Sequence, residues 1–127
     1  MTEWRWISLE LAHAVHDRQL AEHGGLEGIK DIAAVESALA RPRQLAAYGT
    51  PDAFDLAAAY CWGIVRNHGY SDGNKRTGWI LGRLFLADHG IRVQVDPGRA
   101  VVTVERVAAG RVTQDELAQW FREIATD

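Results

Sequence analysis

The chain has 127 residues, a length that suits one ordinary domain and excludes two catalytic domains. Its hydrophobic content of 47% is enough for a packed core and excludes an intrinsically disordered protein. With 14 Lys and Arg against 17 Asp and Glu, the formal charge is −3, which argues against a duplex DNA binder held by a basic surface. We expect one domain over residues 1–127 that makes no direct contact with nucleic acid.

The cysteine content and the apolar runs indicate the compartment. Cys61 is alone and lies in an apolar segment, so it cannot form an internal disulfide and is expected to be a small core residue. The longest apolar run, Leu56 to Val65, is far shorter than the ~18 residues that suggest a membrane span. We therefore expect a cytoplasmic protein with no membrane partner.

Two helices are predicted in the first third of the chain. Ser8 can cap a helix that runs to about Glu22. The apolar face of this helix is expected to comprise Leu11, Ala14 and Val15. A second helix is predicted from Asp31 to Ala40, because Pro42 should prevent its continuation. Residues 41–49 are then expected to form a loop.

Two central helices joined by a polar turn are predicted in the middle of the chain. Thr50 and Pro51 have the chemistry of a helix start. The Ala-rich segment that follows, 52–67, should be buried on several sides. The next helix begins at residue 73 or 74 and runs to about residue 88, since its apolar residues recur at helical spacing.

Two more helices and one short strand are predicted in the last third. Residues 101–107 are ambiguous, because their β-branched side chains favour a strand while valines three residues apart share one helical face. We interpret them as a helix. Thr113 and Glu116 form a capping box that begins the last helix, and the alternation at 91–95 permits one small strand. The expected fold is a compact all-α bundle of about six helices.

Polar side chains gather in the turn between the two central helices, in the run Asn67-His68-Gly69-Tyr70-Ser71-Asp72-Gly73-Asn74-Lys75-Arg76-Thr77. Backbone N–H groups at a helix N-terminus bind phosphate oxygens where a glycine permits close approach. Lys75 and Arg76 oppose the helix dipole in the first turn, so an anionic ligand explains them better than a structural role. From the residues alone, an open alternative is that Asp72 and Asn74 are turn and cap residues and that His68 ends a helix.

Two side chains of this run offer chemistry. Asp72 can hold Mg2+ that bridges nucleotide phosphates, and His68 can act as a general base. The glycine spacing is not that of a P-loop. His13 and His16 imitate metal-ligand spacing, but two histidines do not make a zinc site, so they are expected to be surface or packing residues.

Residues 68–76 resemble the signature of the Fic/Doc family, which has a His followed by an aromatic residue, an acid, Gly-Asn and an Arg. The Lys before the Arg resembles the death-on-curing (Doc) toxin branch. The resemblance extends over nearly the whole chain, through the segments His23–Gly28, Ala38–Pro42 and Leu45–Gly49. It implies a Fic/Doc-like all-α fold and the toxin of a toxin–antitoxin pair.

The resemblance implies a role for each motif residue. His68 matches the catalytic base that acts on a target hydroxyl, and Asp72 matches the acid that holds Mg2+ and the nucleotide phosphates. ATP binding is assigned to Gly73, Asn74, Lys75 and Arg76. The loop over 41–49 resembles the flap that aligns an extended target segment by main-chain pairing. The flap residues expected to bind the target are Leu45, Ala46, Ala47 and Tyr48.

Departures from the family pattern decide the expected reaction. Lys75 stands where AMP-transferring members have a glycine, and Trp79 stands where they have a second arginine. In the Doc branch the first change goes with ATP bound in the reversed sense, so protein phosphorylation is expected, and AMP transfer is the alternative. Gly69 replaces the usual proline and should loosen the turn. Tyr70 replaces the usual phenylalanine, and its hydroxyl needs water or a partner.

The resemblance also implies partners. Some family members carry an inhibitory helix with an [ST]-x-x-x-E-[GN] pattern, but here His23 precedes Glu27-Gly28 where Ser or Thr is required. A cognate antitoxin in trans is therefore expected. A translation factor, elongation factor Tu by resemblance, is the expected target, and its modification would arrest translation. An inactive module that only binds the antitoxin and a nucleotide-binding regulator are also compatible with the sequence.

Overall fold

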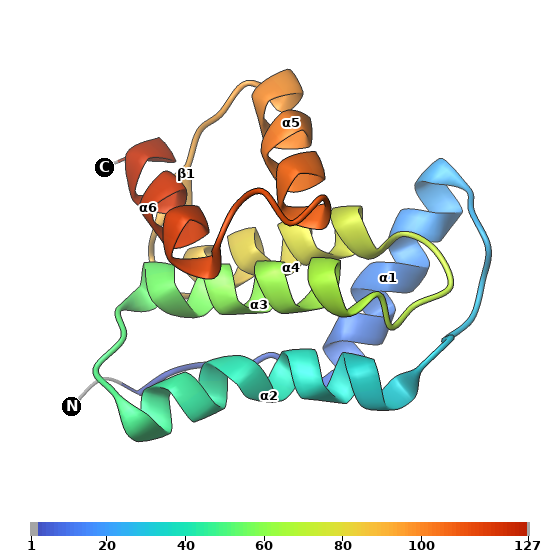
Figure 1. Cartoon of the computed structure of the whole chain (residues 1–127), viewed down its shortest axis with the longest axis horizontal. Helices are drawn as coiled ribbons and strands as arrows, with labels where there is room; N and C mark the ends of the chain where they lie inside the picture. The colour runs from blue at the N-terminus through green and yellow to red at the C-terminus, as the bar shows by residue number, and fades with distance from the viewer. Residues whose placement is uncertain (1–2, 127) are drawn as a thin grey trace.

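The structure, a computed structural model, describes residues 3–126 (Figure 1). This part of the chain forms the helices α1 (Leu9–His23), α2 (Ile32–Tyr48), α3 (Ala53–Asn67), α4 (Asn74–Asp88), α5 (Pro97–Ala108) and α6 (Gln114–Ile124). The strands β1 (Arg92–Val93) and β2 (Ala125–Thr126) pair antiparallel. The expected six-helix, all-α architecture is confirmed. None of the described helices is long and apolar enough to cross a membrane.

Helix α3 lies at the centre of the fold, and α2, α4 and α6 pack around it (Figure 1). Most of its residues are buried, as the Ala-rich sequence predicts. Asp52 is its N-cap, and Asp52 and Asp55 exchange side-chain to backbone hydrogen bonds in a capping box. The helix begins after Asp52, two residues beyond the predicted cap Thr50. The Asp52 carboxylate accepts a hydrogen bond from one of the first N–H groups of the helix, which Thr50 was expected to do.

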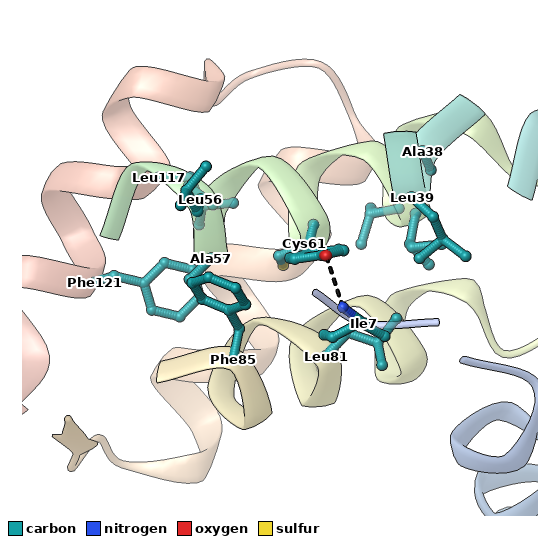
Figure 2. Close-up of a cluster of buried hydrophobic side chains, with 14 of the residues drawn as sticks. Ile7, Ala38, Leu39, Leu56, Ala57, Cys61, Leu81, Phe85, Leu117 and Phe121 are labelled. Atoms are coloured by element: carbon teal, nitrogen blue, oxygen red, sulfur yellow. Dashed lines mark hydrogen bonds between the residues drawn. The ribbon is translucent and has the colours of Figure 1, made fainter. Parts of the chain in front are cut away.

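The hydrophobic core lies between α3 and the helices on either side of it (Figure 2). Cys61 is fully buried there, near Phe85 of α4 and Phe121 of α6. The expected role of Cys61 as a small core residue is confirmed, and burial raises the pKa of its thiol to about 12. The N-terminal segment packs against the core through Ile7, whose backbone N–H donates to the Tyr60 hydroxyl at 2.9 Å.

Helix α2 differs from the prediction, because it continues through Pro42 to Tyr48. A proline inside a helix costs about 3 kcal/mol, since it leaves one carbonyl without a donor and its ring crowds the preceding turn. Close packing on α3 offsets this cost. A Cβ atom on Gly63 would lie 3.2 Å from the Cβ of Ala38, so the two helices touch by their backbones. The predicted loop over 41–49 is therefore wrong.

Helix α1 begins after Ser8 as predicted, but of its predicted apolar face only Val15 packs against the core. Leu11 is 38% exposed and Ala14 is also exposed. The buried residues are Ala12, His16 and Gln19. A polar face can be buried when its side chains find hydrogen-bond partners, and His16 finds one in the turn before α4.

The last third agrees with the prediction. Residues 97–108 are helical, so the valine-rich segment is a helix as interpreted. Thr113 and Glu116 form the predicted capping box of α6. The small strand at 92–93 is also present, and its partner, β2, follows α6 directly.

Candidate active site

The turn between α3 and α4 places His68 in an unusual backbone conformation. His68 is the C-cap of α3, with φ 53° and ψ 44°, and it is the only residue other than glycine with positive φ among those described. A left-handed backbone at such a residue costs on the order of 1 kcal/mol and is concentrated at functional sites. His68 is exposed, and its side chain lines a pocket.

The buried side chain of Asn74 stabilises the turn by hydrogen bonds to the Tyr70 backbone. It is only 3% exposed. Its Oδ1 accepts from the Tyr70 N–H and its Nδ2 donates to the Tyr70 carbonyl, both at 3.0 Å. The same Nδ2 lies 3.3 Å from Nδ1 of His68, a long contact that does not fix which ring nitrogen carries the proton. The side chain of Asn74 is thus occupied by hydrogen bonds within the turn, and its backbone N–H remains available to a ligand.

The start of α4 is built to receive an anion. Gly73, with φ 78°, is the N-cap and supplies no side-chain cap. The first intrahelical bond runs from the Thr77 N–H to the Gly73 carbonyl at 3.0 Å. The N–H groups of Asn74, Lys75 and Arg76 therefore precede the helical ladder, and such groups bind phosphate oxygens.

Asp72 is held next to this helix start by backbone donors. Its Oδ1 accepts from the Gly73 N–H at 2.9 Å, and its Oδ2 accepts from the Leu26 N–H at 3.3 Å. These two bonds, with the nearby charges of Arg76 and His16, hold the pKa of Asp72 below its usual range. An ionised, exposed carboxylate is the kind of ligand that Mg2+ takes together with phosphate oxygens.

A wider metal cluster is not present in the described part of the chain. Within residues 3–126, no group of three or more His, Cys, Asp or Glu side chains is placed to hold a metal ion.

Two histidines of α1, His13 and His16, contact the turn between α3 and α4. Nε2 of His16 lies 2.7 Å from the backbone carbonyl oxygen of Asp72 and donates to it, because a carbonyl oxygen can only accept. The His16 ring also stacks on the Tyr70 ring, with ring centroids 3.8 Å apart. Nδ1 of His13 lies 2.8 Å from the Tyr70 hydroxyl, so the predicted partner of that hydroxyl is His13. Burial raises the pKa of Tyr70 to about 12. The expectation of packing histidines is confirmed, but their contact with the turn between α3 and α4 was not anticipated.

Gly69 tightens the turn, which corrects the expectation that it loosens it. A Cβ atom here would clash with the Val35 side chain and lie 2.9 Å from the Val35 nitrogen. The Gly69 carbonyl also accepts from the N–H groups of Lys30 and Asp31, both at 2.9 Å. Only a glycine allows the turn to lie this close to the start of α2.

The segment predicted to form a target-binding flap is helical and not a loop. Leu45, Ala46, Ala47 and Tyr48 form the last turn of α2, so their N–H groups bond within the helix and the segment is not extended as a strand edge would be. Leu45 lines a separate hollow of about 230 Å³ between α2, α3 and α6, and Tyr48 is 92% exposed. None of these four residues lines the pocket of His68 and Asp72. The error followed from ending α2 before Pro42.

A different segment pairs with the turn. Ile29 forms an antiparallel bridge with Tyr70. The Ser71 N–H donates to the Gly28 carbonyl at 3.1 Å, next to the bond from Lys30 to the turn. In an antiparallel pair of this kind, the backbone groups of the central residue point to the opposite side. The N–H and carbonyl of Ile29 therefore form a strand edge on the side away from Tyr70, and Leu26 and Ile29 are 70% and 44% exposed.

His68 and the residues that begin α4 line one pocket of about 650 Å³, a volume that suits a small ligand such as a nucleotide. Its polar end contains His68, Asp72 and Arg76. Its apolar wall comes from α4 and α5 and comprises Trp79, Ile80, Pro97, Ala100, Val101 and Val104. The sequence-predicted motif residues, His68 and Asp72 to Arg76, are thus brought together at one end of a pocket.

Comparison with known proteins agrees with this geometry. Residues 6–86 match the model of the family described as Fic/DOC family. The chain belongs to the Fic/Doc family. It is 33% identical over 121 residues to the protein kinase doc of Escherichia phage P1, which covers 94% of this chain and 95% of that protein. It is 38% identical over 76 residues to the toxin Doc of Mycolicibacterium smegmatis, 58% of each chain.

Both relatives are Doc proteins, so the expected Doc branch of the Fic/Doc family is confirmed. The family match includes the whole turn and most of α4, and thus every motif residue from His68 to Arg76. Helix α5, which supplies part of the pocket wall, lies beyond it. The similarity to the phage protein extends over nearly the full chain.

Proposed function

We propose that this Doc-type protein is the toxin of a toxin–antitoxin pair and a protein kinase of the cytoplasm. It transfers the γ-phosphate of Mg-ATP to a Ser or Thr hydroxyl of a translation factor, which family resemblance suggests is elongation factor Tu, and so arrests translation and growth. The observation that carries the proposal is the uncapped start of α4, with Asp72 and His68 beside it in one pocket. The relatives named a kinase and a toxin support it.

The pocket explains how ATP would be held. Phosphate oxygens would bind the N–H groups that begin α4, and Arg76 would add a full positive charge. Asp72 would hold Mg2+, which offsets the negative charge of the phosphates. The apolar wall offers a surface for the adenine base, since ligand pockets combine apolar walls with a few polar anchors.

His68 supplies the acid–base chemistry of the transfer. Its imidazole accepts the proton of the target hydroxyl as the hydroxyl oxygen forms a bond to the γ-phosphorus. The bond from this phosphorus to the oxygen that bridges to the β-phosphate breaks, and ADP leaves with the electron pair. Phosphoryl transfer depends on position and charge stabilisation, which the left-handed backbone of His68 and the anchored Asp72 provide.

The strand edge at Ile29 suits the alignment of a target. An extended peptide can add to such an edge by backbone hydrogen bonds, and exposed apolar side chains such as Leu26 add contact area. The edge follows the turn of His68, so a hydroxyl on the bound peptide would meet the imidazole. We propose that this segment performs the role that the sequence suggested for residues 45–48.

Substitution of the strand edge should separate target binding from nucleotide binding. Ile29→Asp is expected to lower target phosphorylation by about tenfold, because it loses an apolar contact and places a charge at the edge. ATP affinity, measured by calorimetry, should not change. Tyr48→Asp, at the highly exposed end of α2, is the matched control and should retain full activity. Loss of ATP binding in Ile29→Asp would show instead that the edge only supports the turn.

A second proposal concerns inhibition. The sequence lacks the inhibitory pattern that some family members carry, so we propose that a cognate antitoxin in trans keeps the protein inactive. Similarity to a protein named toxin Doc supports such a partner. Production of the chain alone in bacteria is then expected to stop growth, and production with its antitoxin is not.

Labelled ATP tests the reaction. The protein, Mg2+ and a bacterial extract are incubated with ATP labelled in either the α- or the γ-phosphate. Label on protein only from γ-ATP, with a mass gain of about 80 Da on the target, supports phosphorylation. Label from α-ATP and an AMP-sized gain would assign AMP transfer instead. Label from neither nucleotide would favour a module that only binds its antitoxin.

A further inference from the structure

A salt bridge joins the two helices that wall the pocket. Nζ of Lys75, in the first turn of α4, lies 2.9 Å from Oε1 of Glu105, near the end of α5. Both side chains line the pocket, and they are 46% and 55% exposed. The cation that stands in the phosphate-binding motif is therefore already paired with a carboxylate.

Glu105 is not explained by stability or by phosphate binding. An ion pair between two half-exposed side chains contributes little to folding. Among the other groups that line the pocket, Arg76 and the N–H groups of α4 attract phosphates, and the Asp72 carboxylate has a proposed role as a ligand of Mg2+. A carboxylate among them repels phosphates and competes with them for Lys75. A lysine ammonium has three donors, so it can be shared, but each donor given to Glu105 is lost to the nucleotide.

We infer that Glu105 is a specificity-determining residue that sets how strongly the pocket favours additional phosphates on a nucleotide. The inference rests on the proposed nucleotide site. Each further phosphate brings more negative charge near the Glu105 carboxylate and requires more of the hydrogen-bond donors of Lys75. Glu105 therefore weakens the binding of ATP more than that of ADP, and that of ADP more than that of AMP. Adenosine, which carries no charge, is unaffected.

Calorimetry of four ligands on a matched pair of variants tests this. Affinities for ATP, ADP, AMP and adenosine are measured at low salt without Mg2+ for the wild type and for Glu105→Gln, which keeps the size of the side chain and removes its charge. ATP should bind Glu105→Gln about fivefold more tightly, the effect of removing one like charge at a partly exposed site. The gain should decrease from ATP to AMP, vanish for adenosine, and shrink at high salt.

Glu36→Gln is the control, because Glu36 is exposed on α2, does not line the pocket, and gives the same change in net charge. It should leave all four affinities unchanged. An equal gain for adenosine and ATP, or a gain in the control, would overturn the inference. Weaker ATP binding by Glu105→Gln would also overturn it, because Glu105 would then hold Lys75 in place for the phosphates.

The same measurements separate this inference from the proposed function. If the wild type binds ATP and Glu105→Gln binds it equally well, the role of Glu105 is rejected and the nucleotide site stands. If neither protein binds any of the four ligands, the proposed nucleotide site is rejected, and the role of Glu105 with it.

Discussion

Replacement of His68 by alanine is expected to lower the rate of phosphoryl transfer by about 100-fold to 10,000-fold, the usual range for loss of a general base. The fold should persist, because His68 is exposed and its side-chain hydrogen bond to Asn74 is long. Initial rates with γ-labelled ATP measure the first effect, and thermal unfolding followed by circular dichroism measures the second. ATP affinity should change little, since the imidazole acts on the target hydroxyl.

His23→Ala is a matched control for this experiment. His23 is another exposed histidine that lines the same pocket, but it lies at the end of α1 and outside the turn. Its loss should leave the transfer rate near that of the wild type. A wild-type rate in His68→Ala would show that another group removes the proton and that the strained backbone of His68 has a different purpose.

Asp72→Asn is expected to reduce transfer by about 100-fold or more, because the pocket loses the charge that would hold Mg2+ and the phosphates. Asparagine keeps an oxygen that can accept from the Gly73 or Leu26 N–H, so the turn should remain folded. The main change should be weaker binding of Mg-ATP, which calorimetry with and without Mg2+ resolves. In the wild type, Mg2+ should tighten ATP binding, and in Asp72→Asn this gain should disappear.

Growth of bacteria gives a second measurement of the same substitution. Production of the wild type alone should stop growth, whereas production of Asp72→Asn should not. Asp115→Asn is the control, since Asp115 is on α6 and lines the separate hollow near Leu45. If Asp72→Asn arrests growth as strongly as the wild type, toxicity does not depend on the carboxylate, and an inactive module that only binds the antitoxin gains support.

Local sequence patterns determined the helices whose ends are marked by their own residues. Ser8 begins α1, and Thr113 with Glu116 begins α6, because a capping side chain acts on N–H groups only two or three residues away. The motif from His68 to Arg76 could be recognised for the same reason, since its side chains and the helix start that they surround are contiguous in the chain.

Tertiary structure decided what distant segments bring together. Helix α2 passes through Pro42 because its packing on α3 outweighs the local cost of a proline, and the segment that pairs with the turn is the one around Ile29. The support of the turn by His16 spans 56 residues, and the pairing of Lys75 with Glu105 spans 30. The sequence by itself determined the class of fold and the residues of the family motif between α3 and α4. Which distant segments contact these residues was decided only by the tertiary structure. Hydrophobic periodicity indicates which face of a helix is apolar, but it does not indicate which segment packs against that face.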